Sequence, residues 1–355
     1  MNVLYVLPVK GGSGGAHSAA QEVDELNKIG LNVKIAVNAD NYPKFLTTYY
    51  DMPRVINNVV SYDNVLQLSK LMAVTDITVC TIFTSVALVK EALTNIRSKK
   101  PKIAYYIQDY EPLFSDPEDP MWKLAYDSYT LIPNIILFAK TLWIMDMVQR
   151  NHNDLVNKVN PSIDHNVYYP DINKPSDKVW ISAMVRPASP RRAPHRTMRV
   201  LKTIKEEFGD RVMINVFGCD DESIINSDLP RDFNFNNHGV LLREQVAALL
   251  RKNHMFVDLS DYQAFGRTGL EAMACGAVSL VPSLGGTSEY AIHKENSFVI
   301  DPRDEEKVKS TIREFIELNL DEKENLKNNA IETAQGFSVN KAALSVYKLF
   351  NESCK

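Results

Sequence analysis

The sequence predicts an α/β protein with two doubly wound parallel sheets, one in each half of the chain. Short apolar runs alternate with helical patterns along both halves, and a segment rich in proline, asparagine and aspartate interrupts this alternation at 160–178. The length of 355 residues suits roughly two domains. We therefore expect one domain at 1–170, a second at 171–338, and a C-terminal helix at 339–355 that either closes the second domain or crosses back to the first.

The first domain begins with a strand, a glycine-rich turn, a helix and a second strand. Strands are predicted at 3–9, 33–37, 77–82 and 103–107. The glycine-rich turn occupies 10–16, a helical pattern runs from Ala19, and Gly30 stands where a glycine would end that helix. A further helix is predicted at 85–97. This order implies right-handed crossovers and a Rossmann-like sheet.

An apolar stretch follows at 132–148. Pro133, Asn134, Lys140 and Asp146 interrupt it, so it falls short of the unbroken run that a membrane-spanning helix requires. We predict a buried helix here, and docking on a membrane surface is the alternative.

The second domain repeats the alternation after residue 178. Strands are predicted at 179–185, 212–217, 254–259 and 278–281. Helices are predicted at 197–208, 244–252 and 268–275. Because ligands of open α/β sheets bind outside the carboxyl ends of the strands, the loops after these strands are the places to seek a site.

Composition and charge exclude several function classes. The chain is 45% hydrophobic and 24% charged, as in soluble globular proteins, and its formal charge of -4 provides no positive field for nucleic acid. Residues 1–9 lack the basic segment and cleavage site of a signal peptide. The four cysteines have no Cys-x-x-Cys spacing. We expect a cytoplasmic protein that binds no nucleic acid.

Three loops carry residues suited to anions. Gly14 and Gly15 belong to the turn before the first helix, whose N–H groups could face an anion, although a plain tight turn is the alternative. Arg186 and Arg192 lie in a proline-stiffened loop with four arginines, where guanidinium groups suit a diphosphate. A solvated basic loop is the alternative there.

The third loop follows the predicted strand 254–259 and leads into a short helix. We expect the first turn of that helix to carry Glu271, whose carboxylate suits ribose hydroxyls. A carboxylate that merely complements the helix dipole is an equal alternative.

Aromatic side chains cluster around the strand 103–107. They are Tyr105, Tyr106, Tyr110, Phe114, Trp122, Tyr126 and Tyr129. Because sugars pack their C–H faces on aromatic rings, the cluster suits a glycan groove, and a buried core cluster is equally consistent with it.

The segment 263–276 resembles the signature of retaining glycosyltransferases of family 4, which usually reads Glu-Gly-Phe-Gly, three variable residues, and Leu-Glu-Ala-Met-Ala-Cys-Gly. Arg186 and Arg192 stand at the spacing of that family's paired basic residues, and Gly218 resembles a further landmark. The stretch 108–112 is similar to members described as rhamnosyltransferases. The resemblance covers nearly the whole chain and is strongest at 179–301.

This resemblance implies a GT-B fold, in which two Rossmann-like domains face a cleft, and a retaining hexosyltransferase. The donor would be a dTDP- or UDP-linked sugar, with rhamnose as the expected sugar, and the acceptor a glycan or lipid-linked glycan. Arg186 and Arg192 would hold the diphosphate and Glu271 the ribose. The other residues implied at the donor are Gly218, Gln263, Phe265, Gly266 and Thr268. The residues implied at the acceptor or reacting centre are Gly14, Gly15, Asp109 and Glu111.

Two glutamines depart from the family pattern. Gln263 replaces the first glutamate of the signature, and Gln108 replaces a histidine. An amide cannot act as a charged nucleophile, so we expect front-face transfer in which the leaving diphosphate takes the acceptor proton. No Asp-x-Asp pair is present, and we expect no metal ion and no cofactor. The alternatives are a catalytically silent glycan-binding or scaffold subunit, and an epimerase or phosphorylase on the same fold.

Overall fold

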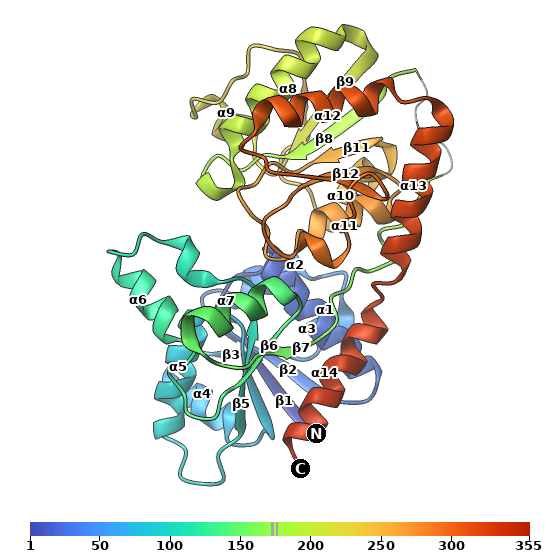
Figure 1. Cartoon of the computed structure of the whole chain (residues 1–355). Helices are drawn as coiled ribbons and strands as arrows, with labels where there is room; N and C mark the ends of the chain where they lie inside the picture. Colours follow the sequence, from blue (N-terminus) through green and yellow to red (C-terminus); the bar gives the residue numbers. More distant parts are fainter. Residues whose placement is uncertain (172–173, 175–176) are drawn as a thin grey trace. The chain divides into compact units, whose positions relative to one another are not determined.

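The computed structural model describes residues 1–171, 174 and 177–355, which form two compact units (Figure 1). Unit 1 contains Met1–Ser162 and Val339–Lys355, and unit 2 contains Ile163–Ser338. The sequence-based boundary lies between 170 and 171, within the connecting segment 160–178. Residues 172, 173, 175 and 176 of that segment lie outside the described residues.

Unit 1 is built on a seven-stranded parallel sheet with the order β3-β2-β1-β4-β5-β6-β7. Its strands are β1 (Asn2–Val6), β2 (Asn32–Asn38), β3 (Val59–Tyr62), β4 (Ile77–Cys80), β5 (Lys102–Ile107), β6 (Ile136–Ala139) and β7 (Asn157–Lys158). In register, Tyr5 of β1 lies beside Ile35 of β2 and Val79 of β4. The central strands are buried on both faces, which is why they read as continuous apolar runs.

Helices connect these strands. They are α1 (Gly14–Lys28), α2 (Tyr42–Thr48), α3 (Pro53–Ile56), α4 (Val65–Met72), α5 (Phe83–Thr94), α6 (Pro120–Asp127) and α7 (Leu142–His152), with a 3-10 turn at Glu111–Phe114. Gly30 follows Ile29, the C-cap residue of α1, and has φ 95, as expected of a glycine that ends a helix.

The predicted helix at 132–148 is wrong in its first part. Ile136–Ala139 form β6, which pairs with β5, and helix α7 begins only at Leu142. Asn134 adopts a left-handed conformation with φ 58 after Pro133, so the chain turns before 136. A branched and aromatic run then enters the sheet, and Thr141 starts α7 by accepting a hydrogen bond from Ile144 N.

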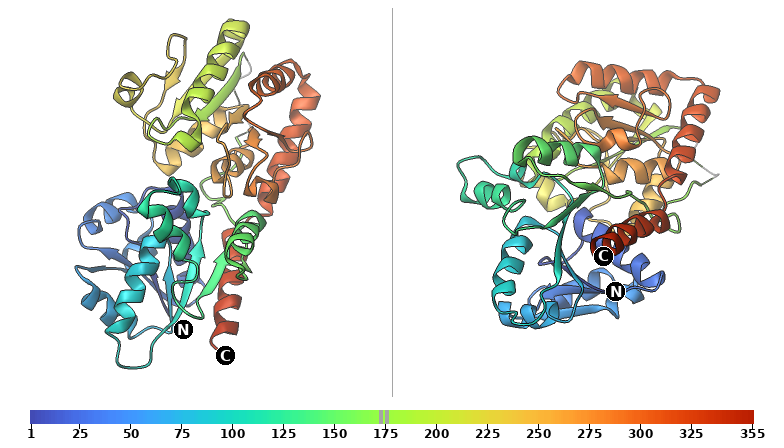
Figure 2. Two further views of the ribbon diagram at one scale, coloured as in Figure 1. Left: turned by 60° about the vertical axis from the view of Figure 1, so that its left-hand side comes forward. Right: turned by 60° about the horizontal axis from the view of Figure 1, so that its bottom comes forward.

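The C-terminal helix α14 (Val339–Ser353) is part of unit 1. It contacts α1, and Figure 2 shows it beside the N-terminal, blue part of the chain. Val346 and Phe350 are fully buried, and the Phe350 ring meets Phe138 of β6 edge-on at 5.8 Å. The helix thus completes the hydrophobic core of unit 1.

Unit 2 has a six-stranded parallel sheet with the order β10-β9-β8-β11-β12-β13. Its strands are β8 (Val179–Met184), β9 (Val212–Phe217), β10 (Asn236–Asn237), β11 (Met255–Val257), β12 (Val278–Pro282) and β13 (Ser297–Ile300). The predicted strands of this domain coincide with β8, β9, β11 and β12 to within a few residues. Together the two sheets confirm the predicted fold class.

Helices cover both faces of the second sheet. They are α8 (Pro194–Phe208), α9 (Asp221–Ile225), α10 (Arg243–Lys252), α11 (Arg267–Ala274), α12 (Glu305–Glu317) and α13 (Leu320–Gln335). Leu201 of α8 and Phe315 of α12 belong to the core on one face. Met273 of α11 and Ala330 of α13 belong to the core on the other. Among the described residues, none of the helices is long and apolar enough to cross a bilayer.

Candidate functional site

The strand order of unit 2 reverses direction at β8 and β11. Chain connections leave β8 toward β9 on one side, and β11 lies on its other side, so the loops after β8 and β11 diverge at a topological switch point. Open α/β sheets bind ligands at such points, outside the carboxyl ends of the strands. These two loops contain Arg186–Arg192 and Asp258–Gly266.

Arg186 lies two residues after the end of β8 and directly follows the fully buried Val185. Its side chain is half-buried and makes no hydrogen bond or ion pair with the described part of the chain. Burial, and after it the positive charge of Arg191, lowers the pKa of Arg186. A desolvated guanidinium that faces another cation and has no carboxylate partner is the arrangement expected of an anion-binding site.

Arg192 lies at the other end of the same compact loop. Ser189 N donates to Arg186 O (3.0 Å), and Arg192 N donates to Ser189 O (2.9 Å), so two consecutive turns hold the loop. Ala193 then adopts a left-handed conformation with φ 47, and α8 begins at Pro194. The fourth arginine of the loop, Arg196, lies inside α8 rather than in the loop.

Gly218 lets the turn after β9 pack directly against this loop. Its φ is 107, and a Cβ atom at this position would lie 2.9 Å from Val185 O and 3.0 Å from Met184 Cγ. Any side chain here would push on the residues immediately before Arg186. The absence of a side chain at Gly218 therefore lets its turn pack closely against the residues that precede Arg186.

Gln263 is fixed by the loop after β11. Its Nε2 donates to Asp258 Oδ2 (2.5 Å) and Ser260 Oγ (3.2 Å). Its backbone oxygen accepts from Gly286 N (2.7 Å), and a Cβ on Gly285 would lie 2.0 Å from that oxygen. The side-chain amide therefore has one defined orientation.

The N-terminus of α11 follows this loop. Gly266 precedes the helix with φ 80, and a Cβ there would lie 2.7 Å from Tyr290 Oη, which donates to Gly266 O. Phe265 meets the Tyr290 ring edge-on at 5.5 Å, and Thr268 lies half-buried in the first turn. Tyr290 thus fixes the point at which the helix starts.

Glu271 lies in the second turn of α11, because the helix starts at Arg267; the expectation that it lies in the first turn is wrong. It is buried and accepts a hydrogen bond from Arg267 Nε at 2.8 Å. Burial raises the pKa of Glu271, and the charge of Arg267 opposes that shift. Arg267 was not among the predicted site residues, although its i,i+4 spacing to Glu271 is typical of a helical ion pair.

Gly14 and Gly15 are the first two residues of α1 rather than members of the preceding loop, which is a correction to the predicted turn 10–16. Ser13 caps the helix, because its Oγ accepts from Ala16 N at 3.2 Å. A Cβ on Gly15 would lie 3.0 Å from Gln108 Oε1. The structure therefore brings Gly15 and Gln108 together at the carboxyl ends of β1 and β5.

Asp109 and Glu111 both lie in the interior of unit 1. Asp109 Oδ1 accepts from Tyr110 N (2.9 Å), while Glu111 Oε2 accepts from Phe83 N (2.7 Å) and Tyr105 Oη (2.5 Å). Burial raises the pKa of Glu111 to about 8. Glu111 thus binds the first N–H of α5, an arrangement that fits a positioning role better than contact with an acceptor.

The aromatic cluster divides into buried and partly exposed members. Tyr105, Tyr106, Tyr110 and Tyr129 are core residues, which agrees with the core interpretation for these four. Trp122 and Tyr126 of α6 stack at 4.8 Å and remain partly exposed. Phe114 is 42% exposed, so it could offer a ring face to a sugar together with Trp122 and Tyr126.

Unit 1 also contains a buried ion pair that was not predicted from the sequence. Lys140, interpreted in the sequence only as an interruption of an apolar stretch, lies 2.9 Å from Glu22 of α1. Its ammonium group also lies 4.9 Å above the centre of the Tyr106 ring. Among the described residues there is no group of three or more His, Cys, Asp or Glu side chains placed to hold a metal ion.

Residues 169–333 match the sequence profile of the family described as glycosyl transferases group 1. Unit 2 is a glycosyltransferase group 1 domain. Sucrose synthase of Solanum tuberosum is 37% identical over 62 residues, and sucrose synthase 5 of Arabidopsis thaliana is 39% identical over 62 residues. These stretches are 18% of this chain but only 8% and 7% of the two plant proteins.

Solved structures resemble the whole chain in fold. HepE of Anabaena, in complex with UDP and glucose, is 16% identical with a TM-score of 0.80, covering 99% of this chain and 100% of that one. Sucrose-phosphate synthase of Thermosynechococcus elongatus is 14% identical with a TM-score of 0.80, covering 99% of each chain. A glycosyltransferase of Rickettsia africae is 18% identical with a TM-score of 0.76, covering 100% of this chain and 98% of that one. These neighbours have the GT-B fold, as this chain does.

The group 1 domain contains every candidate donor residue that was predicted in the second half of the chain. Arg186, Arg192, Gly218, Gln263 and Glu271 all fall within the matched range. The candidates of unit 1 lie outside it, so for them the comparisons support the fold alone.

Proposed function

We propose that this chain is a retaining, metal-independent glycosyltransferase that moves a sugar from a nucleoside diphosphate to a glycan. The observation that carries the proposal is Arg186: a half-buried guanidinium beside Arg191, with no acidic partner among the described residues, at the switch point of a group 1 domain. The diphosphate of a nucleotide sugar supplies the negative charge that this site lacks.

The chemistry requires stabilisation of a leaving group. The bond between the anomeric carbon and the diphosphate oxygen breaks, and its electron pair goes to the diphosphate. The acceptor oxygen bonds to the anomeric carbon on the same face and passes its proton to the departing phosphate oxygen. Arg186, Arg192 and the N-terminus of α11 would stabilise the developing charge, which is why we propose no metal ion and no cofactor.

Further residues would orient the donor. Gln263 is neutral and held by Asp258, so it would bind sugar hydroxyls and form no covalent intermediate. Phe265, Gly266 and Thr268 border the same helix start. Glu271 would bind the ribose, with Arg267 holding its carboxylate in place. We place the acceptor, a glycan or lipid-linked glycan, at Gly14, Gly15 and Asp109 of unit 1.

The identity of the donor rests on two indications. HepE holds UDP and glucose in its crystals, which supports a UDP-linked sugar. The stretch 108–112 supports dTDP-rhamnose through its similarity to rhamnosyltransferases. Both donors present the same diphosphate to Arg186.

A donor panel tests the proposal. The full chain is incubated with UDP-glucose, dTDP-rhamnose and other nucleotide sugars in the presence of a chelator, first with water and then with simple glycosides as acceptors. Release of a nucleoside diphosphate, with the anomeric configuration of the donor kept in the product, supports the proposal. Conversion of the donor to its epimer without release would instead indicate an epimerase.

A catalytically silent binding subunit is the second candidate, and the replacement of glutamate by Gln263 favours it. Such a subunit binds nucleotide sugars or glycans but releases no diphosphate from any donor in the panel. Restoring the usual residue by Gln263→Glu separates the two functions. If the change creates turnover where none existed, the chain is a silent relative.

A further inference from the structure

We infer that Arg196 is a positioning residue that fixes the diphosphate-binding arginine loop to the loop carrying Gln263. The inference rests on the proposed function, because the arginine loop is the part of the site that would bind the diphosphate. Arg196 itself lies in the first turn of α8 and belongs to neither loop.

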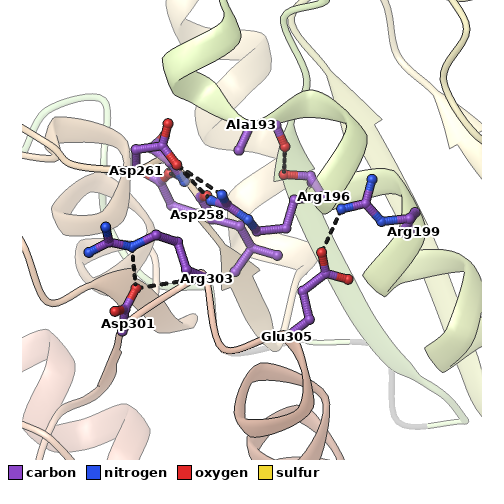
Figure 3. Close-up of polar contacts among 11 residues, drawn as sticks. Ala193, Arg196, Arg199, Asp258, Asp261, Asp301, Arg303 and Glu305 are labelled. Carbon is purple, nitrogen blue, oxygen red and sulfur yellow. Dashed lines mark hydrogen bonds and ion pairs between the residues drawn. The ribbon is translucent and has the colours of Figure 1, made fainter.

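The Arg196 guanidinium is committed to the loop after β11. Its Nη1 donates to Leu259 O (2.8 Å) and to Asp261 Oδ1 (2.9 Å), and its Nη2 donates to the same carboxylate oxygen (2.9 Å). Figure 3 shows the guanidinium reaching from α8 toward Asp261. Its side chain is only 17% exposed. Three hydrogen bonds from one largely buried fork define a fixed contact.

Asp261 carries the connection on to the arginine loop. Its backbone N–H donates to Arg191 O at 2.9 Å, while its carboxylate receives Arg196. The next residue, Tyr262, lies under the Arg191 guanidinium at 5.5 Å. Asp261 is therefore the residue through which α8, the arginine loop and the Gln263 loop meet.

This connection has two consequences for anion binding. Arg186 and Arg191 repel each other, so the loop that carries them needs external contacts to keep both cations near one point. Arg196 also pairs with the Asp261 carboxylate, and Asp261 contacts the arginine loop through its N–H bond to Arg191 O, so the pairing neutralises a negative charge beside that loop. Loss of Arg196 would both loosen the loop and release a carboxylate that competes with the diphosphate.

A matched control lies one turn further along α8. Arg199 donates from Nη2 to Glu305 Oε1 at 2.5 Å, as Figure 3 shows. Glu305 begins α12 and belongs to neither loop. Arg199→Gln therefore removes an ion pair of the same kind from the same helix without touching the connection through Asp261.

The test measures ligand affinity in the full chain by calorimetric titration. UDP, dTDP, GDP and ADP are titrated into the wild type, and the tightest of them and its nucleoside are titrated into each variant. We expect Arg196→Gln to weaken the nucleoside diphosphate about tenfold, which is about 1.4 kcal/mol. The nucleoside, which lacks phosphate, should bind within about twofold of wild type. Arg199→Gln should leave both affinities unchanged.

A second-site variant distinguishes positioning from general damage. Because Asp261→Asn removes the released carboxylate, the double variant Arg196→Gln/Asp261→Asn should bind the diphosphate more tightly than Arg196→Gln alone. Arg196→Lys, which keeps the charge but not the fork, should give an intermediate affinity and serves as the test if Arg196→Gln does not fold. Equal diphosphate affinities for Arg196→Gln and Arg199→Gln would overturn the inference. Failure of the wild type to bind any of the four nucleotides would overturn the proposed function as well.

Discussion

Glu111 is a carboxylic acid buried in the interior of unit 1. Its carboxylate accepts hydrogen bonds from Phe83 N and Tyr105 Oη inside unit 1, and burial raises its pKa to about 8. The sequence identified Glu111 through its neighbours at 108–112 but contained no information on its burial.

Likewise the sequence located Arg186 and Arg192 through local composition, whereas the importance of Arg196 depends on Asp261, which lies far along the chain.

The raised pKa of Glu111 predicts a specific pH dependence of stability. A carboxyl whose pKa is higher in the folded than in the unfolded chain stabilises the fold at low pH, and this contribution is lost as pH rises from about 4.5 through about 8. Glu111→Gln keeps an acceptor oxygen but does not titrate. The variant should therefore gain stability relative to wild type between pH 5 and pH 8.5, by at least about 1.4 kcal/mol, the free energy of one pKa unit.

Urea unfolding of both proteins at pH 5 and pH 8.5 measures this difference. A difference that stays constant, or that moves in favour of the wild type at pH 8.5, would mean that the Glu111 carboxylate is charged in the folded protein.

Elements were predictable where an apolar run is bounded by residues that break it. Strand β9 (Val212–Phe217) begins and ends where the sequence predicts, because a helix-ending glycine precedes it and Gly218 follows. Strand β6 was missed because only Lys140 and Thr141 separate its apolar run from the apolar start of α7. The strands β7 and β10 have two residues each, too few for any periodicity, and exist only through pairing with their neighbours.

Gly218→Ala, in the turn after β9, should lower both the stability of the fold and the affinity for ligand. The new Cβ would lie 2.9 Å from Val185 O and force a residue with φ 107 to accept a side chain, so we expect a loss of about 2 kcal/mol in the free energy of unfolding. Nucleoside diphosphate affinity should also fall, because Val185 precedes Arg186.

Gly30→Ala provides the control for this substitution. Gly30 has a similar φ of 95, but a Cβ there meets nothing within 4 Å. Gly30→Ala should lower the free energy of unfolding by only about 1 kcal/mol, which is the cost of placing alanine in the left-handed region. Its ligand affinity should stay that of the wild type. Equal effects of both substitutions on affinity would show that the close approach of Gly218 to β8 is unimportant.

At the scale of the whole molecule, the last helix, α14, packs on unit 1 although it follows unit 2 in the sequence. The amphipathic pattern of 339–355 suits either domain, and only its partners decide between them: Phe350 packs on Phe138, and α14 contacts α1. Such a long-range choice rests on shape complementarity between surfaces far apart in sequence, which local patterns do not encode.

Phe350→Ala should therefore destabilise unit 1 and spare unit 2. Removal of a fully buried phenylalanine costs about 3–5 kcal/mol. Hydrogen exchange read by mass spectrometry should show faster exchange in β1, β4 and β5 but not in β8, β9 and β11. Leu344→Ala, on the exposed face of the same helix, should change neither. Equal acceleration in both sheets would contradict the assignment of α14 to unit 1.

The most direct test of the central claim is calorimetric titration of UDP and dTDP, without divalent cations, into the wild type and the variants Arg186→Ala and Arg192→Ala. A charged hydrogen bond contributes about 1.5–3 kcal/mol, so each variant should bind at least about tenfold more weakly than wild type. Arg303→Ala, which removes an exposed arginine paired with Asp301, should bind as wild type does. Unchanged affinity in Arg186→Ala and Arg192→Ala would show that the two guanidinium groups do not hold the diphosphate.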